Sequence, residues 1–488
     1  MGNTRKFTIL HSNDMHGQFF AETDKKNGKL VGGIALLSGY INKVRKEEEN
    51  VLYVIAGDML QGSIIDSEFK GISTIEIMNY LAPDVASLGN HEFDYGLSHV
   101  LFLEKMANFP IISANLYIKP THKRLMQPYL IIKKAGFNIM FIGILTEKTM
   151  DSLNQDGLVS SFISLQEASQ EVGRITNAFK NDDIDLTVLL THIGYDEDIA
   201  LAKLLLPEWG VDMIIGGHSH TFLEQPANVN NILIAQAAVG TDQIGRFDIV
   251  VDGDTNSITD YKWQLIPIDK NLAEPDENLA EYIGSFETVV DRKYNSIICK
   301  FTDTLTHPKR EIETSLGNLF ADCLADLGQC DVVLVGSGCI RSKELGPVVK
   351  LGDFRACFPY EDYMTRFNIN GVQLRKIFTH IMRPENRNGQ GECYQVNGKI
   401  RAEYHDNERS LASLTFDGKP VTDEQAYTIG LTGYHILNSP AYLDISNDEL
   451  NASGKSWVVT TNVTDALEEY LKVHQNIGAK VEGRLVYV

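Results

Sequence analysis

The chain has 488 residues, of which 43% are hydrophobic and 22% are charged. This balance is typical of a folded globular protein and excludes a disordered or fibrous chain. At about 150 residues per domain, the length predicts two large domains or three ordinary ones. The 65 acidic residues outnumber the 44 Lys and Arg residues, which gives a formal net charge of −21. Such a chain is a poor candidate for binding nucleic-acid polymers or anionic membranes, because its mean field repels phosphate.

The N-terminal segment shows no targeting pattern. Its apolar stretch, residues 7–10, is too short for the core of a secretory signal peptide. No stretch of the chain is apolar for the length that a membrane span needs. We therefore expect a cytoplasmic protein with no membrane partner, and a secreted chain that has lost its leader is the alternative. The sequence leaves the oligomeric state open.

Five short apolar runs in the first half are each followed at once by a polar cluster. The runs span residues 7–10, 51–56, 85–88, 186–190 and 213–216. Continuous apolar runs of this length are typical of strands buried on both faces. The stretches between them carry helical spacing, as at Leu36, Tyr40 and Val44 and at Ile75, Met78 and Leu81. This pattern predicts a layered α/β domain, whose polar clusters meet at one edge of the sheets.

The pattern changes between residues 271 and 295, where we expect a helix that connects two domains. Pro275 and Asp276 resemble a helix start, and apolar residues then repeat at helical spacing. In the second half we expect a helix over 316–327, a strand over 331–335, a helix over 464–473 and a closing strand over 485–488. The last helix carries a capping pattern at Thr464, Asp465 and Glu468. All six cysteines lie in this half without a CxxC pair, which gives no support to a zinc-finger or thioredoxin-type site.

The polar clusters of the first half share oxygen and imidazole donors and contain no cysteine. Taken singly, each cluster is weak evidence for a metal site, because a lone histidine is more often a core residue than a ligand. The set is more specific, and its members are Asp14, His16, Asp58, Asn90, His91, His192, His218 and His220. Mixed imidazole and carboxylate ligation suits Mn, Zn, Fe, Co or Ni better than a soft thiolate metal. The donors exceed the needs of one tetrahedral ion, and two ions roughly 3.5–4 Å apart with a bridging carboxylate account for them.

In this order, the motifs resemble the signature of the calcineurin-like binuclear metallophosphoesterases. The longer stretch 90–96, Asn-His-Glu-Phe-Asp-Tyr-Gly, and the stretch 313–319 are similar to the 5′-nucleotidase branch, which includes UDP-sugar hydrolases and cyclic-nucleotide phosphodiesterases. The resemblance covers nearly the whole chain. It implies an N-terminal layered α/β-sandwich metallophosphatase domain over 1–270, a connecting helix or hinge over 271–295 and a C-terminal α+β substrate-binding domain over 296–488.

The resemblance also implies roles for the donors. Two divalent ions would be held, the first by Asp14, His16, Asp58 and His220, the second by Asp58, Asn90, His192 and His218. Asp58 would bridge them, and a water between the ions would lose its proton and attack phosphorus in line. His91 resembles the family's catalytic histidine, and Asp94 would orient its ring.

For the second domain, the resemblance implies an aromatic clamp for the base and arginines for the anionic part of the substrate. Tyr360 and Tyr434 are the candidate rings, and stacking is worth ~1–3 kcal/mol per base. Asp362 lies in the same segment as Tyr360, and Arg341 and Arg310 are the candidate arginines. Two departures alter nucleoside recognition. Gly336 stands where the family usually has Asn, and residues 438–441, Asn-Ser-Pro-Ala, replace the usual Gly-Gly-Asp-Gly.

The implied activity is metal-dependent hydrolysis of small-molecule nucleotides, with 5′-nucleotidase activity, which releases nucleoside and phosphate, as the leading hypothesis. A 2′,3′-cyclic-nucleotide phosphodiesterase and a pyrophosphatase acting on nucleotide sugars or dinucleotides are alternatives, because the same metal centre serves them. A non-catalytic binding protein is a third, and the retained Asp58, Asn90, His91 and Asp94 argue against it.

Overall fold

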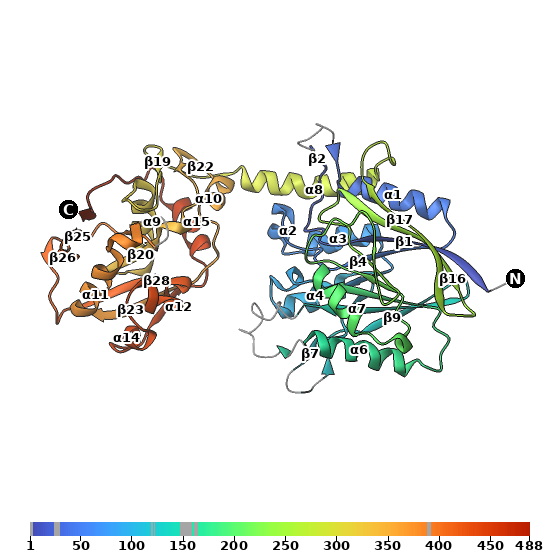
Figure 1. Cartoon of the computed structure of the whole chain (residues 1–488). Coiled ribbons are helices and arrows are strands. Elements are labelled where there is room, and N and C mark those ends of the chain that lie inside the picture. Colours follow the sequence, from blue (N-terminus) through green and yellow to red (C-terminus); the bar gives the residue numbers. More distant parts are fainter. Residues whose placement is uncertain are drawn as a thin grey trace. The chain divides into compact units, whose positions relative to one another are not determined.

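The computed structural model describes residues 3–23, 30–118, 121, 123–146, 159–160, 164–387 and 392–488 (Figure 1). The chain separates into two compact units, Met1–Val290 and Asp291–Val488. Both units combine sheets with helices, as the predicted α/β fold class requires.

Two six-stranded sheets form the centre of the first unit. In spatial order, the first sheet contains β17 (Ser257–Pro267), β16 (Gln243–Asp252), β1 (Thr4–Ser12), β4 (Val51–Ala56), β5 (Val85–Ser87) and β6 (Ile111–Ile112). The second contains β14 (Ala227–Val229), β15 (Ile232–Ala235), β13 (Met213–Ile215), β12 (Leu186–His192), β10 (Phe137–Leu145) and β9 (Tyr129–Lys134). Strands β1, β4, β5 and β6 run parallel, as do β10, β12, β13 and β15. Their carboxyl ends therefore lie along one edge of each sheet.

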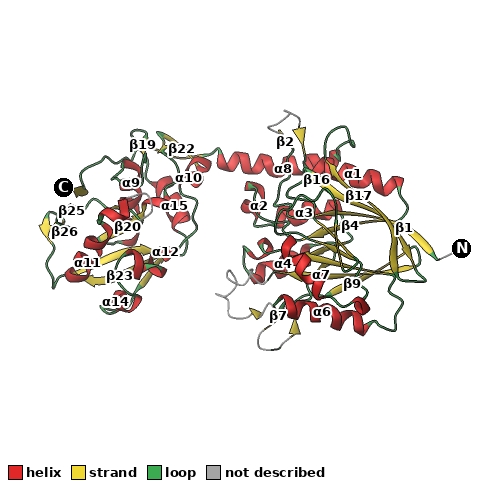
Figure 2. Ribbon diagram, viewed as in Figure 1, coloured by secondary structure: helices red, strands yellow, loops and turns green. Residues whose placement is uncertain are grey.

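The helices of the first unit flank these sheets. They are α1 (Ile34–Glu47), α2 (Ile64–Phe69), α3 (Ile72–Leu81), α4 (Leu97–Met106), α6 (Leu165–Ala178) and α7 (Tyr195–Leu204). Figure 2 shows α1 on one side of the strands and α6 on the other. Short strands complete the unit: β2 (Glu22–Thr23), β3 (Leu30–Val31), β7 (Tyr117–Ile118), β8 (Lys123–Arg124) and β11 (Val159–Ser160).

The two sheets pack face to face through alternate residues. Val54 of the first sheet and Phe141 and Val188 of the second belong to one buried cluster. The intervening Met140 and Leu189 belong to another, which includes residues of α6 and α7. Because successive side chains of a strand point to opposite faces, both faces of β10 and β12 are buried. This double burial explains the uninterrupted apolar runs in the sequence.

Each of the five runs predicted as a strand is a strand, namely β1, β4, β5, β12 and β13. The helices predicted around Tyr40 and Met78 are α1 and α3. The predicted order of elements in the first half is therefore confirmed.

Helix α8 (Glu277–Tyr294) lies where a connecting helix is predicted. Asp276 Oδ1 accepts the backbone N–H of Leu279 at 3.2 Å, so the predicted helix start is confirmed. The Tyr282 hydroxyl donates to Glu76 Oε2 at 2.6 Å, and the Phe286 ring meets that of Phe69 at 5.1 Å between centroids. These contacts fasten the first turns of α8 to the first unit. Its action as a hinge stays a prediction.

A five-stranded sheet forms the centre of the second unit. Its strands are β24 (Tyr394–Val396), β20 (Val332–Gly336), β28 (Ala426–Thr432), β23 (Met364–Asn370) and β29 (Trp457–Thr460). A four-stranded sheet contains β27 (Lys419–Pro420), β26 (Ser410–Phe416), β25 (Ile400–His405) and β30 (Leu485–Tyr487). Two short pairs join β18 (Ile297–Lys300) to β22 (Val348–Lys350) and β19 (Leu305–Thr306) to β21 (Glu344–Leu345).

Helices cover both faces of the five-stranded sheet. They are α9 (Ser315–Gly328), α10 (Leu351–Cys357), α11 (Gly371–Ile381), α12 (Gly433–Leu437), α13 (Ser439–Tyr442), α14 (Asn447–Asn451) and α15 (Val463–Val473). Val333 and Val335 of β20 pack in a cluster with residues of α9, α10 and α15. Val332 and Leu334 pack on the opposite side with residues of α11. The predicted helix 316–327, strand 331–335 and closing strand correspond to α9, β20 and β30.

The predicted cap of the last helix is wrong. The cap is Asn462, whose Oδ1 accepts the N–H of Asp465 at 3.1 Å. Thr464 lies inside the helix and donates its hydroxyl to the Tyr360 carbonyl at 2.9 Å. Glu468 pairs with Arg355 of α10 instead of folding back on the helix start. The Glu468 side chain, which the local pattern assigned to the cap, therefore forms a tertiary ion pair instead.

All six cysteines are free thiols, and all but Cys339 are buried. Burial raises the pKa of Cys357 to about 11, so this thiol is an apolar core residue. Among the described residues, no helix combines the length and the apolar character needed to cross a bilayer.

Candidate active site

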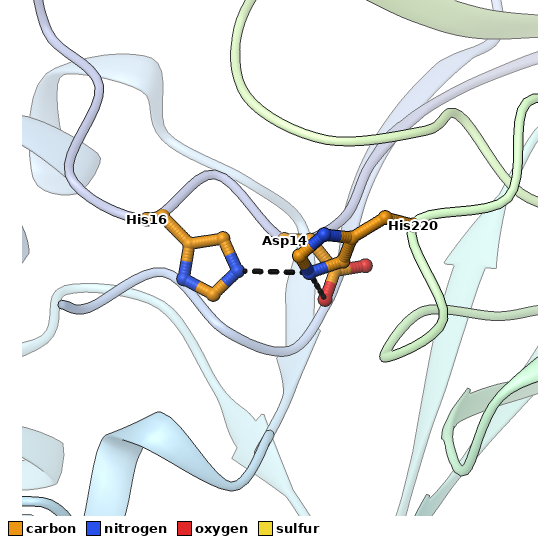
Figure 3. A group of neighbouring side chains, drawn as sticks. All are labelled: Asp14, His16 and His220. Atoms are coloured by element: carbon orange, nitrogen blue, oxygen red, sulfur yellow. Dashed lines mark hydrogen bonds and ion pairs between the residues drawn. The ribbon is translucent and has the colours of Figure 1, made fainter. Parts of the chain in front are cut away.

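The loops that follow β1, β4, β5, β12 and β13 bring the predicted ligands together. Three overlapping groups have ligand atoms within 4.8 Å of one another: Asp14, His16 and His220; His16, Asp58 and His91; and Asp58, His192 and His218. Figure 3 shows the first group, in which His16 Nε2 and His220 Nε2 lie 3.1 Å apart although 204 positions separate them in the chain. Asn90 joins the third group, since its Oδ1 lies 2.7 Å from His218 Nδ1. All seven predicted metal ligands are therefore neighbours.

The backbone at these ligands is in a region that L-residues rarely adopt. Five of the seven have φ between 49° and 79°: Asp14, His16, Asp58, His218 and His220. Such a conformation costs on the order of 1–3 kcal/mol per residue and persists only where surrounding contacts impose it. The buried Asn13 supplies such contacts, because its Nδ2 donates to Asp14 Oδ2 and to the Ala238 carbonyl, both at 2.7 Å. Strain concentrated at one cluster of polar side chains favours a functional role.

Glycine is required beside this cluster. A Cβ at Gly89 would lie 2.2 Å from Asp58 Oδ1 and 2.4 Å from the Asp58 backbone nitrogen. No larger residue fits at position 89, which accounts for the Gly-Asn-His order of the motif.

Two carboxylates form the floor of the site. Asp14 and Asp58 are at most 1% exposed. His192 Nε2 lies 3.0 Å from Asp58 Oδ2, and His220 Nε2 lies 3.4 Å from Asp14 Oδ1. In the described part of the chain, no lysine or arginine forms an ion pair with either carboxylate. Buried anions that face imidazoles but no lysine or arginine are costly unless a cation joins them.

The imidazoles are oriented as metal ligands would be. His192 Nδ1 donates to the Ala56 carbonyl at 2.8 Å, which leaves a lone pair on Nε2. That Nε2 is buried without a well-formed hydrogen bond. His16 Nδ1 lies 3.1 Å from the Gln61 carbonyl, so its Nε2 presents a lone pair toward His220. Lone pairs that converge on buried carboxylates fit a divalent cation, and carboxylate with imidazole suits Mn, Zn, Fe, Co or Ni.

Asp58 and His192 each shift the pKa of the other. Burial alone would raise the pKa of Asp58, but the charge of His192 and the hydrogen bond from the His91 backbone N–H hold that pKa below its ordinary value. Burial alone would lower the pKa of His192, and the charge of Asp58 raises it instead. Asp58 therefore remains ionised, as a bridging ligand must be.

His91 and Asp94 form the predicted dyad. His91 Nδ1 lies 2.7 Å from Asp94 Oδ2, and this hydrogen bond raises the pKa of His91. The His91 backbone N–H donates to Asp58 Oδ1 at 2.9 Å, which ties the dyad to the floor of the site. His91 and His16 are partly exposed and His220 is exposed. The site is thus open on the side of these three rings.

Glu92 supports the site although the ligand pattern in the sequence does not single it out. Its buried carboxylate accepts backbone N–H groups from Met59 at 2.7 Å, Asp58 at 3.0 Å and Gly89 at 2.5 Å. It thereby fastens the loop after β4 to the loop after β5. Burial, reinforced by the charge of Asp58, raises the pKa of Glu92 to about 7. Its place inside the Asn-His-Glu motif was the available signal.

A second support lies under the His218–His220 loop. Gln236 Nε2 donates to the Gly217 carbonyl at 3.2 Å and to Asp198 Oδ2 at 3.1 Å. Its Oε1 accepts the Ser219 hydroxyl at 3.0 Å. No sequence motif marks Gln236 or Asp198, so sequence reasoning had no means of finding them.

The second unit contains a pocket of about 470 Å³. Its lining residues are Gly338, Cys339, Phe358, Tyr360, Glu361, Asp362, Glu392, Thr432, Tyr434 and Val463. Three of the five predicted substrate-binding residues, Tyr360, Asp362 and Tyr434, are among them. The two tyrosines are 47% and 50% exposed, as rings that await a partner would be.

The remaining predicted residues lie beside this pocket rather than in its lining. An Arg341 guanidinium nitrogen donates to the Gly338 carbonyl at 3.4 Å, and Arg310 lies 3.6 Å from Glu392. Asp362 has a structural role as well, because it accepts the backbone N–H of Tyr434 at 2.9 Å. The substrate roles of all five residues stay predictions.

Comparison with known proteins agrees with this arrangement. Residues 7–222 match the family model for calcineurin-like phosphoesterase, and residues 295–440 match the model for the 5′-nucleotidase C-terminal domain. A 5′-nucleotidase-related protein of Glossina morsitans morsitans is 28% identical, over 99% of this chain and 94% of the relative. A snake venom 5′-nucleotidase of Gloydius brevicauda is 26% identical, over 99% of this chain and 89% of the relative.

A solved structure shares the fold of both units. The 5′-nucleotidase precursor from Thermus thermophilus has a TM-score of 0.60 and 23% identity, with 99% of each chain covered. The two family matches cover the two units in turn, and the strand-end clusters lie within the first match. Residues 7–222 are therefore a calcineurin-like phosphoesterase domain, residues 295–440 belong to a 5′-nucleotidase C-terminal domain, and the chain is a phosphoester hydrolase.

Proposed function

We propose that the chain hydrolyses nucleoside 5′-monophosphates to nucleoside and phosphate, using two divalent metal ions. The observation that carries this proposal is the overlap of the three ligand groups at the strand ends, with Asp58 common to two of them. A carboxylate has two oxygens to share, and here Oδ2 faces His192 while Oδ1 accepts the His91 N–H. Relatives named 5′-nucleotidase support the choice of substrate class.

The proposed ligand sets are those implied by the sequence. Asp14, His16, Asp58 and His220 hold one ion, and Asp58, Asn90, His192 and His218 hold the other. Bound there, the ions would activate a water molecule and neutralise charge on the phosphoryl group. The contacts of Glu92 and Gln236 keep the ligand loops in place.

His91 acts on the leaving group in this proposal. Its hydrogen bond to Asp94 favours the protonated ring, so the imidazolium can donate a proton to the departing ribose 5′-oxygen. Asp94 holds the orientation of the ring through this hydrogen bond. The partly exposed position of His91 suits contact with a substrate.

The second unit binds the nucleoside. The exposed rings of Tyr360 and Tyr434 line one pocket, where an aromatic base can stack. In this assignment residues 1–270 supply the metal centre and residues 296–488 supply substrate recognition. The segment 271–295 serves as a hinge.

Phosphate release from a substrate panel tests the proposal. The panel contains nucleoside 5′-monophosphates, 2′,3′-cyclic nucleotides, a UDP-sugar, a dinucleotide and a model phosphoester, each with added Mn²⁺. We expect turnover of the 5′-monophosphates, and metal removal should abolish it. Preference for the cyclic nucleotides or the pyrophosphates would replace the proposed activity with that alternative, and absence of turnover on every ester would refute it.

A further inference from the structure

At position 336, where the family that the sequence resembles usually has Asn, this chain has a glycine, and other side chains occupy the space beside it. Gly336 has no side chain, and a Cβ there would lie 2.5 Å from His435 Cε1 and 2.8 Å from Glu392 Oε1. The space beside this loop is therefore filled by an imidazole and a carboxylate. Glu392 comes from a segment distant in sequence, and it lines the pocket together with Tyr360 and Tyr434.

Neighbouring groups hold the Glu392 carboxylate in place. Its side chain is only 15% exposed, Oε1 lies 3.4 Å from His435 Nε2 and Oε2 lies 3.6 Å from an Arg310 nitrogen. His435 is fully buried and is itself anchored, since its Nδ1 lies 2.9 Å from the Thr432 hydroxyl. A carboxylate held in this way has little freedom to leave the pocket.

The other carboxylates of the pocket are differently placed. Asp362 accepts the backbone N–H groups of Tyr363 at 2.8 Å and Tyr434 at 2.9 Å, one on each oxygen. Glu361 is exposed to solvent. Glu392 is thus the carboxylate best placed to accept hydrogen bonds from a stacked ligand, because its own contacts, at 3.4 and 3.6 Å, are longer than those of Asp362. Its low exposure also favours such bonds, since polar contacts strengthen as exposure to water falls.

The charge of the residues that line the pocket indicates which part of a nucleotide can bind there. Among the described residues that line the pocket, none is a lysine or arginine, and three are acidic. Such a lining repels a phosphate and suits an uncharged aromatic group with N–H donors. The base, rather than the phosphate, is therefore the moiety that faces Glu392.

We infer that Glu392 determines base specificity and selects guanine nucleotides. This inference rests on the proposed function. An ionised carboxylate only accepts hydrogen bonds, and its two oxygens can take two parallel ones. Guanine presents two adjacent donors, N1–H and the 2-amino group. Adenine presents its 6-amino donor beside the N1 acceptor, which the carboxylate repels, and uracil presents a single N–H between two carbonyls.

Steady-state kinetics on the full-length protein with GMP, AMP and IMP test this inference. We expect kcat/KM for GMP to exceed that for AMP by on the order of 10- to 100-fold, as one bidentate contact provides. IMP, which lacks the 2-amino group, should fall between them. Glu392→Gln should remove most of the GMP preference, mainly through KM, because an amide offers one donor and one acceptor and can pair with adenine.

Glu361→Gln is the matched control, since it removes the same charge from the same pocket and should leave the GMP to AMP ratio unaltered. Glu392→Asp keeps the acceptor and should retain part of the preference. Thermal unfolding of each variant establishes that it is folded. Equal kcat/KM for GMP and AMP in the wild type, or an unchanged ratio in Glu392→Gln, overturns the inference.

Calorimetric binding of guanosine and adenosine separates the inference from the proposed function. Tighter binding of guanosine than of adenosine, lost in Glu392→Gln, supports the role of Glu392 even if no nucleotide is hydrolysed. Hydrolysis of GMP and AMP at equal rates leaves the proposed function intact and refutes the role of Glu392. Equal binding of the two nucleosides refutes it as well.

Discussion

At the scale of single residues, Asp58 connects several parts of the site. It belongs to two ligand groups, it faces His192, and it accepts the His91 backbone N–H. These partners come from the ends of β1, β5, β12 and β13, whereas Asp58 follows β4. A change at Asp58 should therefore disturb the proposed ions together, not one of them alone.

We predict that Asp58→Asn loses bound metal and activity. The amide keeps the size of the side chain but removes the negative charge between the ions, so turnover should fall by more than the roughly 10- to 100-fold that loss of a supporting contact costs. Elemental analysis and phosphate release measure the two effects. Asp260→Asn, which removes an exposed carboxylate, is the control. Full metal content in Asp58→Asn would contradict its bridging role.

Glu92 leads to a separate prediction. In Glu92→Gln one acceptor oxygen becomes a donor, so backbone N–H groups of Asp58, Met59 or Gly89 lose their partner. The expected costs are about 1–3 kcal/mol of unfolding free energy and roughly 10- to 100-fold in metal affinity. Urea unfolding and metal titration measure them. The exposed Glu281→Gln should show neither change, and identical behaviour of the two variants would refute the positioning role.

Residues that the sequence identified share one property. Each proposed metal ligand ends a buried strand or follows one closely, so the apolar run of the strand locates the ligand. Glu92 stands inside such a motif, but it belongs to neither proposed set of metal ligands, so the ligand pattern does not identify it. Gln236 and Glu392 act through contacts between distant segments, and a pattern read along the chain contains no trace of such contacts.

At the scale of elements, local patterns predicted helices and strands well and caps less well. Apolar runs buried on both faces marked the strands of the first unit, because burial on both faces removes alternation. The capping pattern at Thr464 failed because Asn462 caps the helix and Glu468 accepts a hydrogen bond from Arg355. Arg355 lies on α10, and its approach to α15 depends on how both helices pack against β20.

The pairing of α15 with α10 predicts a pH-dependent stability. Burial alone would raise the pKa of Glu468, but hydrogen bonds from Lys472 and Arg355 hold it below its ordinary value of 4.5. A depressed pKa stabilises the fold above the unfolded-state value, and this contribution is lost as pH falls through the folded-state value. Glu468→Gln should therefore lose about 1–2 kcal/mol at neutral pH.

The loss should shrink as the pH falls below 4.5, because the wild-type carboxylate then takes up its proton. Urea unfolding across this range measures it. Glu469→Gln, an exposed neighbour on the same helix, should match the wild type at every pH. A difference between Glu468→Gln and wild type that is constant with pH would show a packing effect instead of an ionic one.

At the scale of the whole molecule, the structure divides into two units, and the first of them includes the start of α8. The motif resemblance ends the first domain at residue 270, whereas the compact unit extends to Val290. The difference is the start of α8, where Tyr282 contacts Glu76 and Tyr80, and Phe286 contacts Phe69. Helical spacing shows that these residues share a face, but it does not show what that face meets.

Because each unit has its own buried core, ligands should stabilise the units separately. We predict that Mn²⁺ raises the unfolding temperature of the first unit and that guanosine raises that of the second. A ligand at 100 times its Kd adds about 2.7 kcal/mol to the form that binds it. Calorimetry of the full chain measures the transitions, and hydrogen exchange in β12 and in β28 assigns them. In Asp58→Asn the effect of Mn²⁺ should disappear while that of guanosine remains, and a shift of both transitions by either ligand alone would contradict the division of roles.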